Sequence, residues 1–189
     1  MNTFNRSTLK ILPIIICFAL LTMLVPAAMT ATITITLDNV TTSVCNTIWN
    51  EAGCHLWFTE TTPEDLTFPY CLVYPSASIV GETGVYIWPA RLGVSLINMT
   101  GVQTIEIDVY ETHFAGSTRA FLYSDGTPVD SHWSFQEDLQ TLSLDVGENI
   151  VDQFAVSGHE SYVLEIRIIG ADLVPVQQQL FETVKALYR

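Results

Sequence analysis

Apolar and polar residues alternate along most of the chain between residues 32 and 169. This is the pattern of strands that bury one face and expose the other. In the clearest case, residues 104–111, Ile105, Ile107 and Val109 alternate with polar side chains, and we expect a central antiparallel strand there. Strands are predicted at residues 32–38, 85–88, 92–96, 104–110, 119–123, 129–133, 140–145, 150–156 and 162–169. Turn-forming residues separate them, so the sequence predicts an antiparallel β-sandwich of about eight to ten short strands.

Two segments lack this alternation. Residues 41–84 carry cysteines, prolines and many aromatic residues, and predict an elaborated loop that packs over one end of the core, with part of a functional surface as the alternative. Short strands are expected within it at 55–59 and 71–74. In the C-terminal segment, residues 175–189, apolar residues follow helical spacing and predict a short amphipathic helix that packs back on the sandwich.

The first residues have the organisation of a secretory signal. Basic Arg6 and Lys10 precede an apolar run and then a group of small residues, which predicts a signal segment at 1–31 and a mature domain at 32–174. The run of about 15 apolar residues is shorter than the roughly 20 that a spanning helix needs. We therefore expect an extracellular or periplasmic protein with no stable membrane insertion after cleavage; an uncleaved anchor is the less favoured alternative.

The charge of the chain excludes one class of partner. The net charge is −13, and removal of residues 1–31 takes away two basic residues and no acidic one, which leaves −15. Nucleic acids and anionic membranes are bound through clustered Lys and Arg, so neither is expected as a partner. The histidines lack zinc-ligand spacing, and no calcium-binding loop, nucleophile elbow or phosphate-binding glycine loop occurs, so no metal and no cofactor is predicted.

Three cysteines lie in the mature region, where an oxidising compartment favours one disulfide. Cys45 with Cys54 is the first expectation, because residues 50–53 supply a turn between them. Cys54 with Cys71 is the second. The remaining cysteine is then buried, free or paired between chains.

Residues 85–169 resemble secreted bacterial jelly-roll domains, a group that includes many carbohydrate-binding modules. The residues that carry the resemblance are 87–92, 105–109, 120–126 and 162–167. The resemblance implies a jelly-roll sandwich and secretion. It implies no particular ligand, because this fold hosts many unrelated functions.

A local resemblance points to a different function. Residues 88–90, followed by the E-x-D-x-x-E pattern at 106–111, resemble the active-site strand of laminarinase-type glycoside hydrolases. The resemblance implies Glu106 as nucleophile, Asp108 as its assistant and Glu111 as acid/base, with two carboxyl groups about 5–5.5 Å apart for retaining hydrolysis. Strand alternation places Glu111 on the opposite face unless a β-bulge intervenes. Solvent-facing structural roles for Glu106 and Asp108 are the favoured interpretation.

Aromatic residues supply a candidate binding site. Trp133, with His132 and Asp130 nearby, could present a platform and polar groups to a sugar ring, and the same holds for Trp57 and Trp88. The alternative for each is an ordinary core or corner role. The sequence thus predicts a secreted, non-catalytic recognition module for a glycan or a surface protein. A compact hydrolase and a structural or assembly protein are the alternatives.

Overall fold

The computed structural model describes residues 31–38, 40, 45, 48–60, 71, 73–79, 81–112 and 116–173. Within these residues there are strands and no helix. The strands are β1 (Thr32–Ile35), β2 (Ile48–Glu51), β3 (Cys54–Thr59), β4 (Val73–Ile79), β5 (Glu82–Ile87), β6 (Ala90–Ser95), β7 (Met99–Thr100), β8 (Thr104–Glu111), β9 (Thr118–Ser124), β10 (Thr127–Trp133), β11 (Asp138–Asp145), β12 (Gln153–Gly158), β13 (Ser161–Ile169) and β14 (Asp172–Leu173). The predicted helix at 175–189 and all but the last residue of the predicted signal segment at 1–31 lie outside the described residues.

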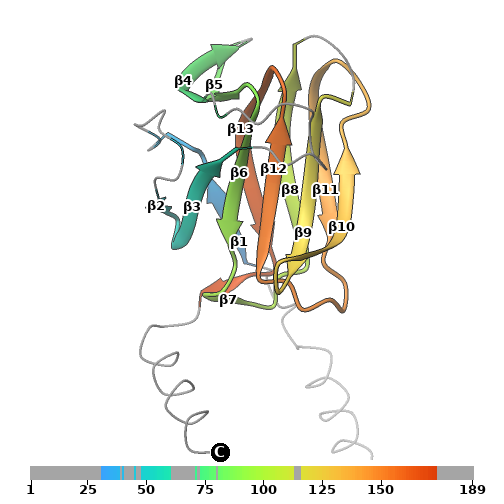
Figure 1. Cartoon of the computed structure of the whole chain (residues 1–189). Coiled ribbons are helices and arrows are strands. Elements are labelled where there is room, and N and C mark those ends of the chain that lie inside the picture. Colours follow the sequence, from blue (N-terminus) through green and yellow to red (C-terminus); the bar gives the residue numbers. More distant parts are fainter. Residues whose placement is uncertain are drawn as a thin grey trace, which may run out of the picture. The chain divides into compact units, whose positions relative to one another are not determined.

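Two six-stranded antiparallel sheets form the two layers of a β-sandwich (Figure 1). The β9 sheet has the order β10-β9-β12-β6-β3-β2. The β8 sheet has the order β11-β8-β13-β5-β4, with β1 also paired to β13. Strands β7 and β14 form a separate short pair. The predicted antiparallel sandwich is thus confirmed, and its jelly-roll connectivity stays a prediction.

The core lies between the two sheets because most of the long strands turn alternate apolar side chains inward. Ile105, Ile107 and Val109 of β8 are fully buried, as their alternation predicts. The largest fully buried side chains come from both sheets and include Phe58, Ile87, Leu92, Leu122, Phe154 and Ile166. Strand β8 pairs with β11 on one side and β13 on the other, so its predicted interior position is correct.

Two tight hairpins fix the registers of the β9 sheet. The β9–β10 turn consists of Asp125 and Gly126, with φ angles of 49° and 73°. The β2–β3 turn consists of Ala52 and Gly53, with φ angles of 50° and 83°. Positive φ at both central residues matches the right-handed twist of the flanking strands. Strand β2 was not predicted, because its four residues carry no clear alternation.

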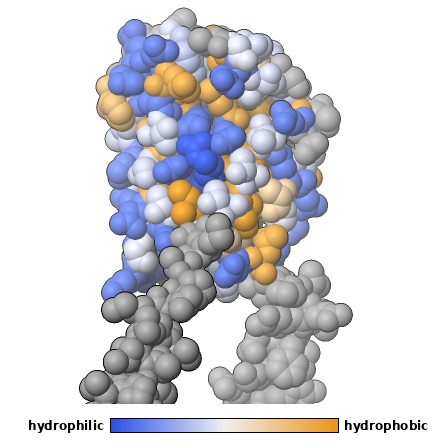
Figure 2. All heavy atoms as spheres, turned by 180° about the vertical axis from the view of Figure 1, so that it is seen from behind, coloured by the Kyte–Doolittle hydropathy of each residue, from blue (hydrophilic) through white to orange (hydrophobic). Residues whose placement is uncertain are grey.

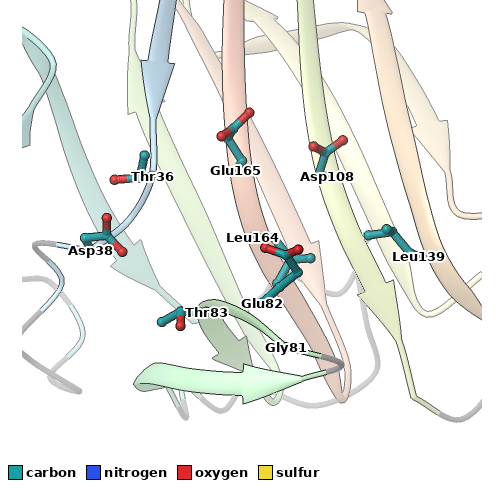
Figure 3. Close-up of a pocket in the computed structure, with 9 residues that line it drawn as sticks. All are labelled: Thr36, Asp38, Gly81, Glu82, Thr83, Asp108, Leu139, Leu164 and Glu165. Atoms are coloured by element: carbon teal, nitrogen blue, oxygen red, sulfur yellow. The ribbon is translucent and has the colours of Figure 1, made fainter.

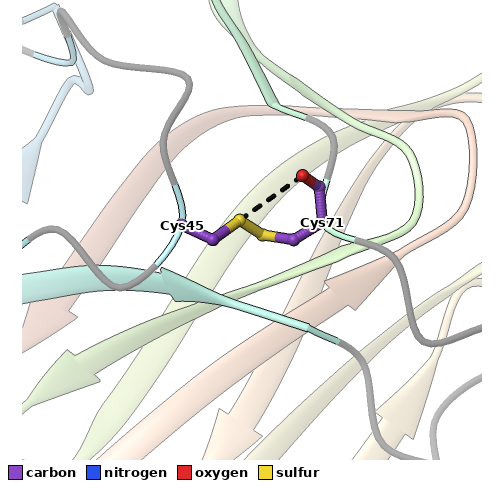
Figure 4. The surroundings of a disulfide bond; sticks show 2 residues. All are labelled: Cys45 and Cys71. Carbon is purple, nitrogen blue, oxygen red and sulfur yellow. Dashed lines mark hydrogen bonds between the residues drawn. A yellow bond between two sulfur atoms is a disulfide. The ribbon is translucent and has the colours of Figure 1, made fainter.

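The disulfide joins Cys45 to Cys71, with Cα atoms 6.2 Å apart (Figure 4). Both expected pairings, Cys45–Cys54 and Cys54–Cys71, are wrong. A turn does lie between Cys45 and Cys54, at Ala52 and Gly53. The register of the hairpin sets Glu51 opposite Cys54, and Cys45 lies outside the paired residues.

Cys54 is a free cysteine with its side chain in the core. Burial, together with the nearby carboxylate of Glu51, raises the pKa of its thiol to about 12. The reactive thiolate form is therefore suppressed at neutral pH, and Cys54 is a packing residue.

Candidate functional site

Three rows of side chains cross the outer face of the β9 sheet. Residues paired across neighbouring antiparallel strands share one face of a sheet, so the registers define the rows. The rows are Thr59, Arg91, Ser157, Arg119 and Trp133; Ile48, Trp57, Gly93, Ala155, Phe121 and Ser131; and Asn50, His55, Ser95, Gln153 and Tyr123. None of these residues is acidic, although the chain as a whole has a net charge of −13.

The indole of Trp57 lies directly across the backbone of Gly93. A Cβ atom placed on Gly93 would come within 2.4 Å of Cε2 and 2.5 Å of Cζ2 of the indole. Only glycine allows this approach, so Gly93 determines the orientation of the ring. Trp57 is a predicted site residue, but Gly93 was missed. An isolated glycine inside a predicted strand is the signal that could have indicated a close approach.

A hollow of about 400 Å³ adjoins this indole. Its lining consists of Ile48, His55, Trp57, Ser95, Ile97, Asp152 and Gln153. Ligand sites typically combine an apolar surface with a few convergent polar groups, and this hollow has both. The polar residues were not predicted, because they come from β3, β6 and residues 152–153 at the start of β12, which are distant in sequence.

Two arginines cover aromatic rings in the middle of the same face. The guanidinium carbon of Arg91 lies 4.8 Å from the ring centroid of Tyr123, and that of Arg119 lies 4.5 Å from that of Phe121. Both rings are buried beneath these cations. Trp133 at the edge also contacts Arg119, at 4.7 Å, but remains 46% exposed. The ring surfaces that remain accessible are therefore those of Trp57 and Trp133.

The structure separates Trp133 from its two expected companions. Trp133 pairs with Arg119 on the outer face, whereas His132 pairs with Ala120, whose side chain points into the core. Asp130 lies on the same side of β10 as His132, and the two side chains are 4.0 Å apart. Since successive side chains alternate along a strand, Asp130 and His132 cannot share a ligand platform with Trp133.

Trp88 lies away from both platforms, in the turn between β5 and β6. Its Nε1 donates a hydrogen bond to Nε2 of His159, at 3.2 Å, and the two rings meet edge to face. His159 belongs to the turn between β12 and β13. The side chain of Trp88 thus connects two turns at one end of the sandwich.

The three carboxylates of the E-x-D-x-x-E pattern do not converge. Glu106 and Asp108 lie on the outer face of the β8 sheet, where both bind Arg167. Glu111 is 1% exposed inside the sandwich, and its Oε2 accepts hydrogen bonds from Ser117 and Ser161. The pairing of β8 with β11 is continuous from residue 104 to 111, so no bulge in β8 reverses the alternation. The nucleophile and acid/base that the hydrolase resemblance implies therefore lie on opposite faces.

Arg167 bridges three carboxylates on the outer face of the β8 sheet. It donates hydrogen bonds to Asp108 at 2.5 and 2.9 Å, to Glu106 at 3.0 Å and to Glu165 at 2.7 Å. Partial burial alone would raise the pKa of Asp108, but the bonds from Arg167 and Thr141 outweigh it and hold the pKa below its usual 3.8. These contacts likewise raise the pKa of Arg167, most of all the hydrogen bonds that it donates to Asp108.

Replacement of Arg167 by methionine is expected to lower the free energy of unfolding by about 1–2 kcal/mol at neutral pH, because three carboxylates lose their counter-charge in a partly exposed site. A carboxylate whose pKa is lower in the folded than in the unfolded state stabilises the fold at pH values above its ordinary pKa. This stabilisation is lost as the pH falls through the pKa of the folded state. The difference between Arg167→Met and wild type should therefore shrink below about pH 4 in urea unfolding. A difference that stays constant with pH would contradict the ionic role; Glu82→Gln, outside the network, is the control.

The described residues contain no group of three or more His, Cys, Asp or Glu side chains suited to a metal ion. The same part of the chain has no helix that is long and apolar enough to cross a membrane.

No protein-family model matches the chain, and no curated protein matches it. Several solved structures of carbohydrate-binding modules are similar to it. A family 32 module from C. perfringens, in complex with galactose, has 12% identity and a TM-score of 0.42 over 74% of this chain and 99% of that one. A xylan-binding module of family 86 from Roseburia intestinalis has 8% identity and a TM-score of 0.37 over 73% and 94%.

Proposed function

We propose that the chain is an exported, non-catalytic glycan-binding module of the jelly-roll type, and that its site is the outer face of the β9 sheet around Trp57. The observation that supports this most is the indole of Trp57, laid flat on Gly93 at the side of a polar-rimmed hollow. A sugar ring offers C–H groups on its face and hydroxyl groups at its rim. An aromatic ring beside hydrogen-bonding groups matches both.

The hydrogen-bonding groups come from the row beside Trp57. His55, Ser95 and Gln153 are neighbours across β3, β6 and β12, and all three line the hollow. Between them they offer hydroxyl, amide and imidazole groups that can each donate and accept. Sugar hydroxyls also both donate and accept, so this row suits an uncharged sugar better than an apolar ligand.

Trp133 is a second contact point for a longer chain. Four strand spacings separate β3 from β10, which places Trp133 about 19 Å across the sheet from Trp57. The two arginines stacked on Phe121 and Tyr123 lie between them. An extended oligosaccharide would contact Trp57 at one end and Trp133 at the other, with guanidinium groups along its path.

Export is supported by the signal-like first residues and by the disulfide between Cys45 and Cys71, since disulfides persist in oxidising compartments. A non-catalytic role is supported by the positions of Glu106 and Glu111 on opposite faces of β8. The Glu111 carboxylate has no open path to a substrate on the face that carries Glu106.

The test is a screen of the purified protein on β-glucans, xylans, galactans and related polysaccharides. Retention by pull-down and release of reducing ends are read in parallel, for wild type and for Glu106→Gln. We expect retention on at least one polysaccharide, the same retention for Glu106→Gln, and no release. Release by wild type that Glu106→Gln loses would establish the hydrolase instead. Absence of retention on every polysaccharide would overturn the proposal and direct attention to a surface protein as partner.

A further inference from the structure

A row of four tyrosines crosses the outer face of the β8 sheet, opposite the site proposed above. Tyr74 of β4 pairs with Tyr86 of β5, Tyr86 with Tyr162 of β13, and Tyr162 with Tyr110 of β8. Successive ring centroids are 5.7, 4.9 and 6.3 Å apart. Leu139 of β11 continues the row beyond Tyr110. We call these five residues the tyrosine row.

The tyrosine row is exposed at both ends, since Tyr74 and Leu139 are 51% and 52% exposed. It contributes nothing to the core, because its side chains point away from the opposite sheet. Partial burial, with Glu160 and the neighbouring tyrosines, raises the pKa of Tyr86, so its hydroxyl stays a hydrogen-bond donor. Cross-strand aromatic pairs of this kind stabilise a sheet, and the row in addition presents ring surface to solvent at Tyr74.

A hollow of about 450 Å³ lies on the same face and shares Leu139 with the row (Figure 3). The hairpin of β4 and β5 forms one wall, and residues from β13, β8, β11 and the segment just after β1 form the rest (Figure 3). Four of its lining residues are acidic: Asp38, Glu82, Asp108 and Glu165. A strongly hydrophilic patch lies at the centre of this face in Figure 2.

The four acidic residues of this hollow differ in their hydrogen-bond and ion-pair partners. Asp108 and Glu165 bind Arg167, which is the basic residue of this face among the described residues. The carboxylates of Asp38 and Glu82 make no hydrogen bond or ion pair within the described part of the chain. Among the described residues, the face therefore combines electron-rich ring faces with more acidic than basic side chains, and both features attract a cation.

We propose that the tyrosine row and the adjoining hollow form a second glycan site, selective for a sugar chain that carries free, protonated amino groups. The ring faces of the tyrosines bind the sugar rings and ammonium groups, and Asp38 and Glu82 pair with ammonium groups. A basic peptide is the less suitable occupant. Side chains on one face of an extended peptide repeat about every 6.6–6.8 Å, whereas successive ring centroids of the row are only 5.7, 4.9 and 6.3 Å apart.

This site is independent of Trp57, because the two lie on opposite outer faces of the sandwich. The module would then hold two glycan chains at once, one on each sheet. Bridging of chains is a function that the first site alone does not provide.

The test uses the purified protein and a fully deacetylated glucosamine hexamer, with the N-acetylated hexamer, a neutral glucose hexamer and a lysine hexamer as comparisons, in calorimetric titrations at low salt. Variants are Tyr74→Ala, an exposed edge residue, and Glu82→Gln, an exposed carboxylate. The circular dichroism spectrum reports on folding. Trp57→Ala is the matched control from the opposite face.

We expect the glucosamine hexamer to bind at least fivefold more tightly than the acetylated and neutral hexamers. Tyr74→Ala and Glu82→Gln should each weaken it threefold or more, with Trp57→Ala unchanged. Binding of the acetylated or the lysine hexamer as tight as that of the glucosamine hexamer would overturn the proposal. No binding of the glucosamine hexamer to wild type, or unchanged binding to both Tyr74→Ala and Glu82→Gln, would also overturn it. Loss of binding in Trp57→Ala alone would assign the glucosamine hexamer to the first site, and this result would also overturn the proposal of a second site.

Discussion

Replacement of Trp57 by alanine is expected to weaken glycan binding tenfold or more, with little change in the melting temperature. The indole is the accessible ring beside the hollow, and loss of an aromatic stacking partner with its buried area costs a ligand about 1.5–2 kcal/mol. The side chain lies outside the core, so the fold should persist. Affinity electrophoresis in gels that contain the retained polysaccharide measures the loss.

Gly93→Val should weaken glycan binding as much as Trp57→Ala does, although the indole of Trp57 is still present. The added side chain would occupy the space of Cε2 and Cζ2, which forces the ring of Trp57 off the sheet. Trp88→Ala is the matched control, because Trp88 is an exposed tryptophan held by His159 outside this face. Equal losses for Trp57→Ala and Trp88→Ala, or full binding by Gly93→Val, would refute this assignment of the site.

Removal of the disulfide is expected to lower the free energy of unfolding by about 3 kcal/mol. The bridge closes a loop over a sequence separation of 26 residues, and such a loop restricts the unfolded chain by roughly this amount. The variant is Cys45→Ala/Cys71→Ala, and urea unfolding without reductant measures the effect. A reductant should destabilise wild type by a similar amount and leave the double variant unchanged.

Cys54→Ala serves as the control for this measurement, since its thiol is free and buried. It should lose some packing energy but keep its sensitivity to the reductant. A Cys54→Ala variant that no longer responds to reductant would show that Cys54 takes part in the bridge and would contradict the pairing.

The long strands after residue 84 could be predicted from the sequence because alternation and turn signals mark them, whereas the two-residue strands β7 and β14 were not predicted. Asp125 and Gly126, for example, specify a two-residue hairpin without reference to the rest of the chain. The pairing of Cys45 with Cys71 joins one residue before β2 to another after β3, over a sequence separation of 26 residues. No local pattern encodes that pairing, so the choice by turn proximity was wrong.

The candidate site was predictable only in part, for the same reason. Alternation alone gives the side of a strand on which Glu106, Asp108 and Glu111 lie, and it correctly placed Glu111 opposite the other two. Rows across a sheet require the strand order and registers, which bring Trp57 onto Gly93 and align the tyrosine row. Residues adjacent in sequence, such as His132 and Trp133, were grouped as one site although alternation puts them on opposite sides of β10.

The most direct test of the glycan site is a titration of ¹⁵N-labelled protein with an oligosaccharide from the retained polysaccharide, observed through the indole Nε1–H signals. Each signal is assigned by replacement of one tryptophan with phenylalanine. The account predicts a saturable shift of the Trp57 signal, a smaller one for Trp133 and none for Trp88. A shift confined to Trp88, or binding without any change at Trp57, would contradict it.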